Sequence, residues 1–221
     1  MSPKVTGAAA FLPERRTLRV LQTAVQGCRG CELYRAATQA VFGEGPDKAR
    51  IVFVGEQPGD AEDRRGHPFV GPAGKLLHRA LLDAGIDDRD IYVTNAVKHF
   101  KFEERGKRRI HQKPKASEVA ACKPWLAAEL DLIKPRVIVC LGATATQAIL
   151  GRSYRLTKER GKFVGHPWAP RVTATLHPSA VLRAPDAGQR HEAYRQLVAD
   201  LQKVQAENRN AAFPTSVEHA V

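Results

Sequence analysis

The chain has 221 residues, and its 35 Lys and Arg outnumber 23 Asp and Glu, which gives a formal net charge of +12. This length suits one domain with short extensions, and 43% hydrophobic with 26% charged residues is typical of a globular protein with a buried core. No apolar run in the sequence approaches the roughly 18 residues of a membrane span, and the apolar stretch near the N-terminus stops at Pro13, too early for a signal peptide. These features argue against a membrane protein and predict a cytoplasmic one.

The predicted elements alternate along the chain. Four short apolar runs predict strands at residues 51–54, 91–94, 137–141 and 172–176. Apolar spacing and capping residues predict helices near 18–27, 76–85, 117–132, 143–150 and 187–204. We expect Ser117 to cap the third helix and Pro124 to break it. Polar, aperiodic ends predict a flexible N-terminus over 1–14 and a flexible tail over 207–221, with one domain over 15–206.

Short apolar strands that alternate with helices are typical of a parallel sheet buried on both faces. The sequence therefore predicts an α/β fold with three layers, α/β/α, around a central four-stranded parallel sheet. Ligands of such domains bind beyond the carboxyl ends of the strands. A glycine-rich loop, Asn95 and His177 each follow a predicted strand, so we expect them to converge on one crevice.

The basic charge is concentrated in one segment. Residues 98–115 contain eight Lys and Arg and two Glu, a net charge of +6 and half of the excess of the whole chain. The segment also contains Phe100, Phe102 and His111, so an exposed loop without function is the weaker interpretation. A basic protein with such a segment is predicted to bind a polyanion, nucleic acid before a membrane surface.

The cysteines predict a metal site. Four cysteines in a chain without an export signal argue against a disulfide framework, and Cys28 and Cys31 have the spacing of a metal-binding pair. On the residues alone, a zinc site with three cysteines and one histidine is as good a reading as an iron–sulfur cluster.

The loop after the first strand reads GEQPGDAED and fits neither of the common phosphate-binding motifs. A plain tight turn would explain its Gly and Pro. Its acids Glu56, Asp60 and Glu62 would repel phosphate, so they need another role in a protein that is predicted to bind DNA. Stabilising a developing positive charge or holding a histidine would be such a role.

Four segments together carry a resemblance: GEQPGDAEDRRGHPFVGPAG, YVTNAVK, ACKPWL and the late HPS. They strongly resemble the iron–sulfur uracil-DNA glycosylases in order and spacing, from about Cys28 to the last helix. Gln57 and the insertion KRRIH resemble the X class, because family 4 has Gly at the first position and lacks the insertion. The resemblance implies a uracil-DNA glycosylase domain over 15–206.

This resemblance assigns roles around the base. A base within a duplex is out of reach, so the nucleotide must be single-stranded or flipped into a pocket. By resemblance, Phe69 stacks on uracil, Asn95 reads its polar edge, and His177 stabilises the uracil anion. Glu56, Gln57 and Asp60 resemble the residues that orient the sugar and the attacking group, and we assign them jointly.

His111 in KRRIH resembles the X-class histidine that attacks C1′ of the sugar and stays bonded to it, which implies a single turnover. Arg109 is expected to lock the loop or contact the substrate, and Lys107 and Arg108 to bind phosphate. Two alternatives stay open: a conventional family-4-like glycosylase in which water completes the reaction, and a non-catalytic binder of single-stranded DNA.

The resemblance also implies a [4Fe–4S] cluster. Its proposed ligands are Cys28, Cys31, His99 and Cys122, with His99 where family 4 has a cysteine. Cys140 lies within an apolar strand and is expected to be a buried thiol. The implied substrate is uracil-containing DNA, preferably single-stranded, and we expect a monomer.

Overall fold

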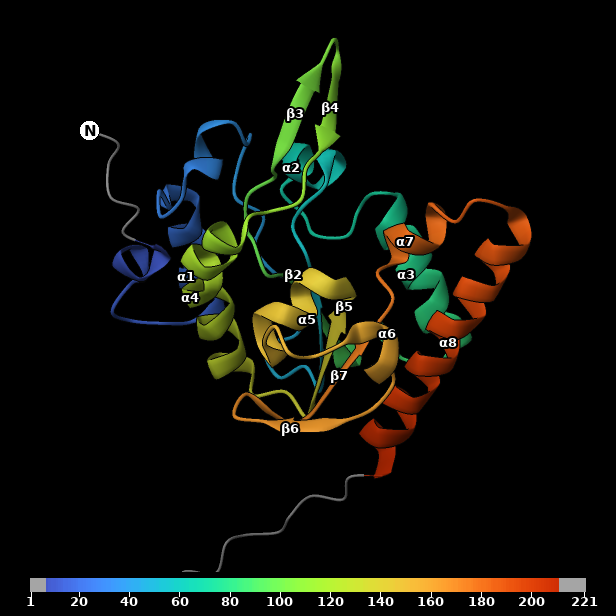
Figure 1. The fold of residues 1–221 in the computed structure, drawn as a ribbon. Coiled ribbons are helices and arrows are strands. Elements are labelled where there is room, and N and C mark those ends of the chain that lie inside the picture. The colour runs from blue at the N-terminus through green and yellow to red at the C-terminus, as the bar shows by residue number, and fades with distance from the viewer. Residues whose placement is uncertain (1–6, 211–221) are drawn as a thin grey trace, which may run out of the picture.

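A five-stranded sheet forms the centre of the protein in the computed structural model, which describes residues 7–210. Its strands are β1 (Ile51–Gly55), β2 (Ile91–Asn95), β5 (Val137–Leu141), β6 (Val164–His166) and β7 (Ala169–Thr175). They lie in the order β2-β1-β5-β7-β6 (Figure 1). The four predicted strands are all present and run parallel, because each is an apolar run that can be buried on both faces.

The fifth strand corrects the predicted strand number. β6 pairs antiparallel with β7 at the edge of the sheet. Its three residues are exposed or half-buried, so the segment carries no apolar run by which the sequence could reveal a strand.

A separate two-stranded sheet replaces the predicted basic loop. β3 (Phe102–Arg105) and β4 (Arg108–His111) form an antiparallel hairpin that projects from the body of the protein (Figure 1). Gly106, with a φ of 60°, stands in the turn, where this backbone conformation favours glycine. The sequence concealed the hairpin because five of the eight strand residues are charged.

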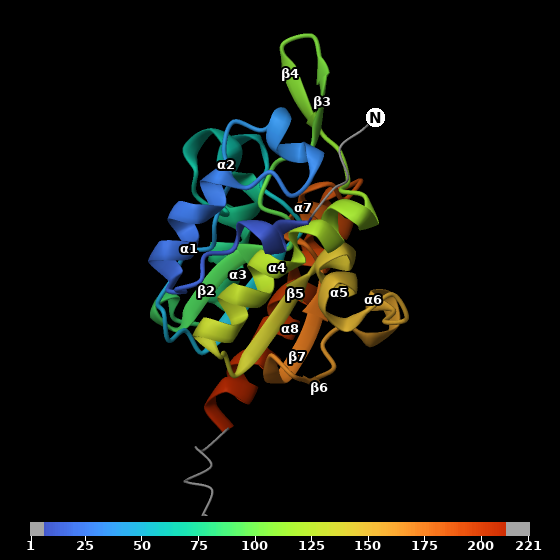
Figure 2. The ribbon, with the colours of Figure 1, turned by 90° about the vertical axis from the view of Figure 1, so that its left-hand side faces the viewer.

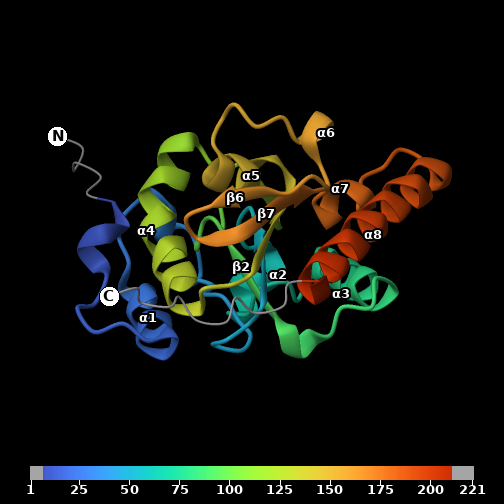
Figure 3. The ribbon, with the colours of Figure 1, turned by 90° about the horizontal axis from the view of Figure 1, so that it is seen from below.

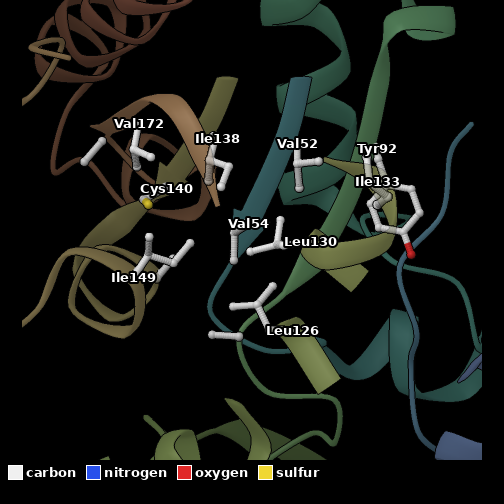
Figure 4. Packing of buried hydrophobic residues seen from close by; sticks show 14 of the residues in the cluster. Val52, Val54, Tyr92, Leu126, Leu130, Ile133, Ile138, Cys140, Ile149 and Val172 are labelled. Atoms are coloured by element: carbon white, nitrogen blue, oxygen red, sulfur yellow. The ribbon is translucent and has the colours of Figure 1, made fainter. Parts of the chain in front are cut away.

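Helices cover both faces of the sheet and confirm the three-layer α/β/α architecture (Figure 3). The helices are α1 (Leu18–Ala24), α2 (Asp60–Arg65), α3 (Pro72–Asp83), α4 (Ala116–Ile133), α5 (Gly142–Leu150), α6 (Leu156–Glu159), α7 (Pro178–Leu182) and α8 (Ala187–Asn210). α4 and α5 pack on one face against Val52 and Val54 of β1 (Figure 4). α3, α7 and α8 pack on the other face against Ile51 and Phe53, because alternate residues of a strand point to opposite faces.

Pro124 does not break the helix that contains it, contrary to our prediction. α4 is continuous over 18 residues, and Cys122, Trp125 and Leu126 are buried on either side of the proline. Tertiary packing therefore outweighs the hydrogen bond that proline removes. The helix also begins earlier than predicted: its cap is Lys115, whose backbone N–H donates to the carboxylate of Glu118 at 2.6 Å, and Ser117 lies inside it.

The structure extends the ordered segments beyond the predicted domain boundaries. Residues Ala8–Phe11 form a short 3-10 helix that packs against α4, and Ala8 is buried. α1 also lies beside α4 (Figure 2). α8 continues to Asn210. Residues 1–6 and 211–221 of the two predicted flexible segments lie outside the described residues. Of the helices within residues 7–210, none is both long and apolar enough to span a membrane.

Candidate active site

A cavity of about 710 Å³ opens at the carboxyl ends of the parallel strands. Six of the residues predicted to act on the substrate line it together: Glu56, Gln57, Phe69, Asn95, His111 and His177. They come from the ends of β1 and β2, from the segment between α2 and α3, from β4, and from the start of α7, so the predicted convergence on one crevice is confirmed. Its size is that of a pocket for a small molecule or a single base.

The floor of the cavity depends on close packing around two glycines. A Cβ on Gly55 would lie 2.3 Å from Oδ1 of Asn95 and 2.8 Å from Cζ of Phe69, so a larger residue would displace both side chains. A Cβ on Gly74 would lie 1.6 Å from the backbone oxygen of Phe69. Phe69 itself has a φ of 56°, which is unfavourable for a bulky residue. The surrounding fold therefore holds Phe69 in a strained but fixed position.

Glu62 fixes the two ends of the loop that carries Phe69. Its carboxylate accepts a hydrogen bond from the backbone N–H of Gly59 at 3.1 Å and another from that of Gly71 at 2.7 Å. The sequence grouped Glu62 with the acids expected to stabilise a positive charge or hold a histidine, and did not predict this contact with the backbone. Its place three residues into a helix, where an acid can reach back to the start, was the signal that could have revealed this role.

Glu56 and His111 meet at the mouth of the cavity. Nε2 of His111 lies 3.3 Å from Oε1 of Glu56, and the hydroxyl of Thr144 donates to Oε2. Burial raises the pKa of Glu56, but the hydrogen bonds from His111 and Thr144 and the electrostatic interaction with the two nearby imidazoles lower it by more, so the net shift is downward. Glu56 is therefore an anion near neutral pH, next to a half-exposed imidazole.

His177 faces the cavity as a neutral hydrogen-bond donor. Its pKa is lowered to about 4, mainly by burial. Nδ1 accepts the backbone N–H of Ser179 at 3.1 Å, so in the neutral ring the proton must lie on Nε2. The turn at the start of α7 thus sets the tautomer, and Ser179 is a contributor that the motif HPS contained but the sequence did not explain.

Gln57 ties the foot of the β3–β4 hairpin to the sheet. Its side-chain amide donates to the backbone oxygens of Lys101 at 3.2 Å and Gln112 at 3.0 Å, and its oxygen accepts the N–H of Lys101 at 3.1 Å. Lys101 and Gln112 flank the hairpin on either side. The side chain of Gln57 is thus engaged with the backbone at both feet of the hairpin that carries His111.

Arg109 is a second anchor of the hairpin. Its guanidinium bonds to Asp60, to Asp63 at 2.7 Å and to Thr38 at 3.2 Å, and it lies over the rings of Phe100 and Phe102. Of its two predicted roles, this geometry fits the locking of the loop. Asp60 is engaged in that anchor and lies outside the described residues that line the cavity.

Lys107 and Arg108 lie near the free end of the same hairpin, exposed to solvent. They also lie outside the described lining of the cavity. Their position leaves their charges available to a partner that approaches the hairpin from outside.

A family profile described as the uracil DNA glycosylase superfamily matches residues 42–202. The chain belongs to that superfamily. A type-4 uracil-DNA glycosylase of Thermotoga maritima is 37% identical over 190 residues, which cover 86% of this chain and 93% of the relative. One of Archaeoglobus fulgidus is 37% identical over 184 residues, covering 80% and 89%. A type-5 uracil-DNA glycosylase of Pyrobaculum aerophilum is 34% identical over 149 residues, covering 59% and 62%.

A second group of predicted site residues, the cysteines of the predicted metal site, lies outside the described lining of the cavity. Cys28, Cys31 and Cys122 belong to one buried cluster, between the N-terminal segment and α4. Trp125 donates its ring N–H to Sγ of Cys28 and the backbone N–H of Lys98 donates to Sγ of Cys122, each at 3.2 Å. Such donors suit sulfur that carries negative charge. Cys140 is instead a buried residue of β5 and packs in the core on the α4–α5 side, as predicted.

The pKa shifts in this cluster follow from its burial. Burial raises the pKa of the Cys122 thiol to about 12, against the charge of Lys98, and it also raises the pKa of Cys31. His99 is buried, and burial lowers its pKa to about 4, so the imidazole is neutral. Within residues 7–210, no group of three or more His, Cys, Asp or Glu side chains has the arrangement of a metal-ion site.

A buried ion pair connects the cavity with this cluster. Lys98 and Glu129 are both fully buried and bond to each other. Lys98 also donates to the backbone oxygen of Asn95 at 3.0 Å and to Thr94 at 2.6 Å. The sequence did not single out Lys98, although it stands in the shared segment YVTNAVK, where a lysine in an apolar strand exit was the available signal.

Proposed function

We propose that the protein is a uracil-DNA glycosylase that cleaves the N-glycosidic bond of deoxyuridine. The observation that carries the proposal is the convergence of Phe69, Asn95, His177 and Glu56 on one cavity. The type-4 and type-5 names of its relatives support the same activity. Phe69 offers a ring to stack on uracil, and the amide of Asn95 can both donate to and accept from its polar edge.

Bond cleavage gives the electron pair of the C1′–N1 bond to uracil and leaves a sugar that resembles an oxocarbenium ion. Nε2–H of His177 stabilises the negative charge that develops on a uracil oxygen, since the ring is neutral and its Nδ1 is already engaged. The anionic Glu56 stabilises the positive charge of the sugar. Both groups are held before the substrate arrives, which is the condition for effective electrostatic stabilisation.

The sugar is then captured by His111. The unprotonated Nδ1 of His111 donates its lone pair to C1′, and the proton on Nε2 passes to the carboxylate of Glu56, 3.3 Å away, which leaves a neutral alkylated imidazole. The contact of His111 with Glu56 at 3.3 Å and the two anchors of the hairpin support this step. Because an alkylated imidazole is a poor leaving group, each molecule acts once. This behaviour would make the protein a member of the X class.

A gel experiment tests release and capture together. The purified protein is incubated with a labelled single-stranded oligonucleotide that contains one deoxyuridine, then boiled and run under denaturing conditions. We expect a shifted band that is absent for His111→Ala and present for His78→Ala, a matched surface histidine on α3. Free uracil is measured in the same samples, and the comparison with duplex DNA tests the preference for single strands.

Two other outcomes have clear meanings. Released uracil with no shifted band would identify a conventional type-4-like glycosylase, a reading that the 37% identity with type-4 relatives favours. If neither free uracil nor a shifted band is detected, the non-catalytic DNA-binding protein is the remaining interpretation. Loss of uracil release in His111→Ser would contradict our separation of excision from capture, because a smaller residue there leaves room for water.

We also propose that Cys28, Cys31, His99 and Cys122 hold a [4Fe–4S] cluster. Burial of all four side chains and the donors to Cys28 and Cys122 support it. In a cluster each ligand binds a different iron, so the ligands need not surround one point. The group would join the N-terminal segment to α4 as a structural element. A brown protein with iron and sulfide is expected, whereas a colourless protein with zinc would overturn the assignment.

A further inference from the structure

Two grooves flank the central cavity on opposite sides. The α4–α5 groove is a depression of about 350 Å³ lined by Lys113, Lys123 and Arg152, and it shares Lys113 and Thr144 with the central cavity. The α3–α8 groove is a depression of about 500 Å³ lined by Lys75, Arg79 and Arg190. α7 separates it from the cavity and lines both. In Figure 1, α4 and α7 lie on either side of the foot of the hairpin.

The described lining of both grooves carries positive charge without negative charge, although Asp186 lies close enough to Arg190 for its carboxylate to interact with the charge of that guanidinium. No Asp or Glu of the described chain lines either groove. Elsewhere many surface arginines are paired with acids, as in Arg35 with Glu32 and Arg171 with Glu207. By contrast, none of the six Lys and Arg of the two grooves takes part in an ion pair within residues 7–210. Unpaired cations in two depressions fit phosphates spaced along a strand.

Of these three depressions, only the central cavity has Asp or Glu in its described lining. Glu56 and Glu62 line it, one beside His111 and the other engaged with backbone N–H groups. Tyr194 adds an aromatic ring to the α3–α8 groove, with the guanidinium of Arg79 5.6 Å from its centre. A ring of this kind can stack on an unpaired base. Positive charge thus stands where a nucleic acid backbone would lie and negative charge where a sugar reacts.

We propose that one DNA strand runs through the α4–α5 groove, the central cavity and the α3–α8 groove, so that the nucleotides on both sides of the uracil are held by their phosphates. This proposal rests on the proposed function and adds the path of the substrate. It makes a single strand the natural ligand, because both neighbours of the reacting nucleotide lie in depressions of the protein surface.

The test measures binding rather than chemistry. The probe is a fluorescent single-stranded oligonucleotide with one central deoxyuridine that carries a 2′-fluorine, which opposes formation of the oxocarbenium-like sugar. One double variant, Lys75→Ala/Arg190→Ala, removes two cations from the α3–α8 groove. The other, Lys123→Ala/Arg152→Ala, removes two from the α4–α5 groove. Arg19→Ala/Lys48→Ala is the control, since it also removes two exposed cations but lies outside the described lining of the cavity and grooves.

Each groove pair should reduce the slope of log Kd against log salt by about 1.4, the loss expected for two contacts to a single strand. The binding defect should therefore shrink by about sevenfold between 50 and 200 mM salt. The control should keep the wild-type slope. An oligonucleotide that ends at the deoxyuridine on its 5′ or its 3′ side should remove the effect of one groove pair and keep that of the other.

The proposal is overturned if the groove pairs bind like the control, if truncation leaves both effects in place, or if the effects appear only with duplex DNA. Thermal unfolding and iron content of each variant exclude a damaged fold. Failure of the proposed function gives a different result: the wild type would then release no uracil from an oligonucleotide without fluorine. If uracil is released at saturating DNA while the groove variants bind DNA as tightly as the wild type, only the strand path is refuted.

Discussion

The residues around the cavity are held in two different ways. Asn95 and His177 stand at the ends of sheet strands and are fixed by the core, through the buried Lys98 and the turn that begins α7. His111 stands on a hairpin outside the core, half-exposed, and is held by the side chains of Gln57 and Arg109. The group that would read and release the base is thus part of the fold, whereas the group that would capture the sugar is attached to it. Perturbations of the two regions should have separable effects.

The largest effect is expected in the core region. Lys98→Met leaves the carboxylate of Glu129 buried without its cation, and breaking such a pair costs about 3–5 kcal/mol of unfolding free energy. Chemical denaturation measures the loss. Lys98→Met/Glu129→Gln should recover most of it, because the amide stays neutral and its oxygen still accepts from Thr94 and Tyr92. A double variant as unstable as the single one would contradict this explanation.

His177→Ala should slow uracil release by about 10²–10³-fold, the usual cost of one donor to a developing anion. A single-turnover assay of free uracil measures the rate. Ser179→Ala keeps the backbone N–H that sets the tautomer, so it should have a much smaller effect. Equal effects of the two substitutions would show that the turn, and not Nε2–H, matters.

Gln57→Ala should reduce covalent capture by about 10²-fold, since a displacement of about 1 Å in a reacting group has this effect. Uracil release should change little, because Asn95 and His177 are held independently of the hairpin. The gel assay and the uracil assay on the same samples give both rates. Gln39→Ala is a control glutamine that bonds to backbone of α2 instead. Equal losses of uracil release and covalent capture would show that the two regions act as one unit.

The pH dependence of release should be the smallest effect. The pKa of His177 is about 4, so the neutral donor persists and release should stay level from pH 8 to about pH 5. Stability behaves differently: an unfolded histidine takes up a proton near pH 6.5 and the folded one only near pH 4, so the contribution of His177 is complete above 6.5 and declines between these values. Release that fell with a midpoint near pH 6.5 would contradict the neutral ring.

The core region was also the part that the sequence predicted best. The runs that form β1, β2, β5 and β7 were visible because a parallel strand is apolar on both faces. Since strand ends meet at one edge, the convergence of Asn95 and His177 followed. The sequence did not predict the hairpin, because its stability comes from turn geometry and from contacts such as those of Gln57. Neither can be inferred from a pattern of charged residues.

The errors have the same origin. Pro124 is tolerated inside α4 because Trp125 and Leu126 pack on either side of the chain, a tertiary effect that local propensity ignores. The resemblance assigned Asp60 and Gln57 jointly with Glu56 to the sugar and the attacking group, and the sequence could not separate their roles. The structure directs their side chains to Arg109 and to the hairpin backbone, a distinction that depends on rotamers and not on spacing.

The two feet of the hairpin lie next to each other: the backbone N–H of Gln112 donates to the oxygen of Lys101 at 2.9 Å. The chain therefore leaves and re-enters the body at almost the same point, and removal of residues 102–111 would require the closure of only a short gap. In engineering terms, the segment is a cassette whose ends already meet, and its exchange requires a new partner for the buried carboxylate of Asp63, which Arg109 now pairs.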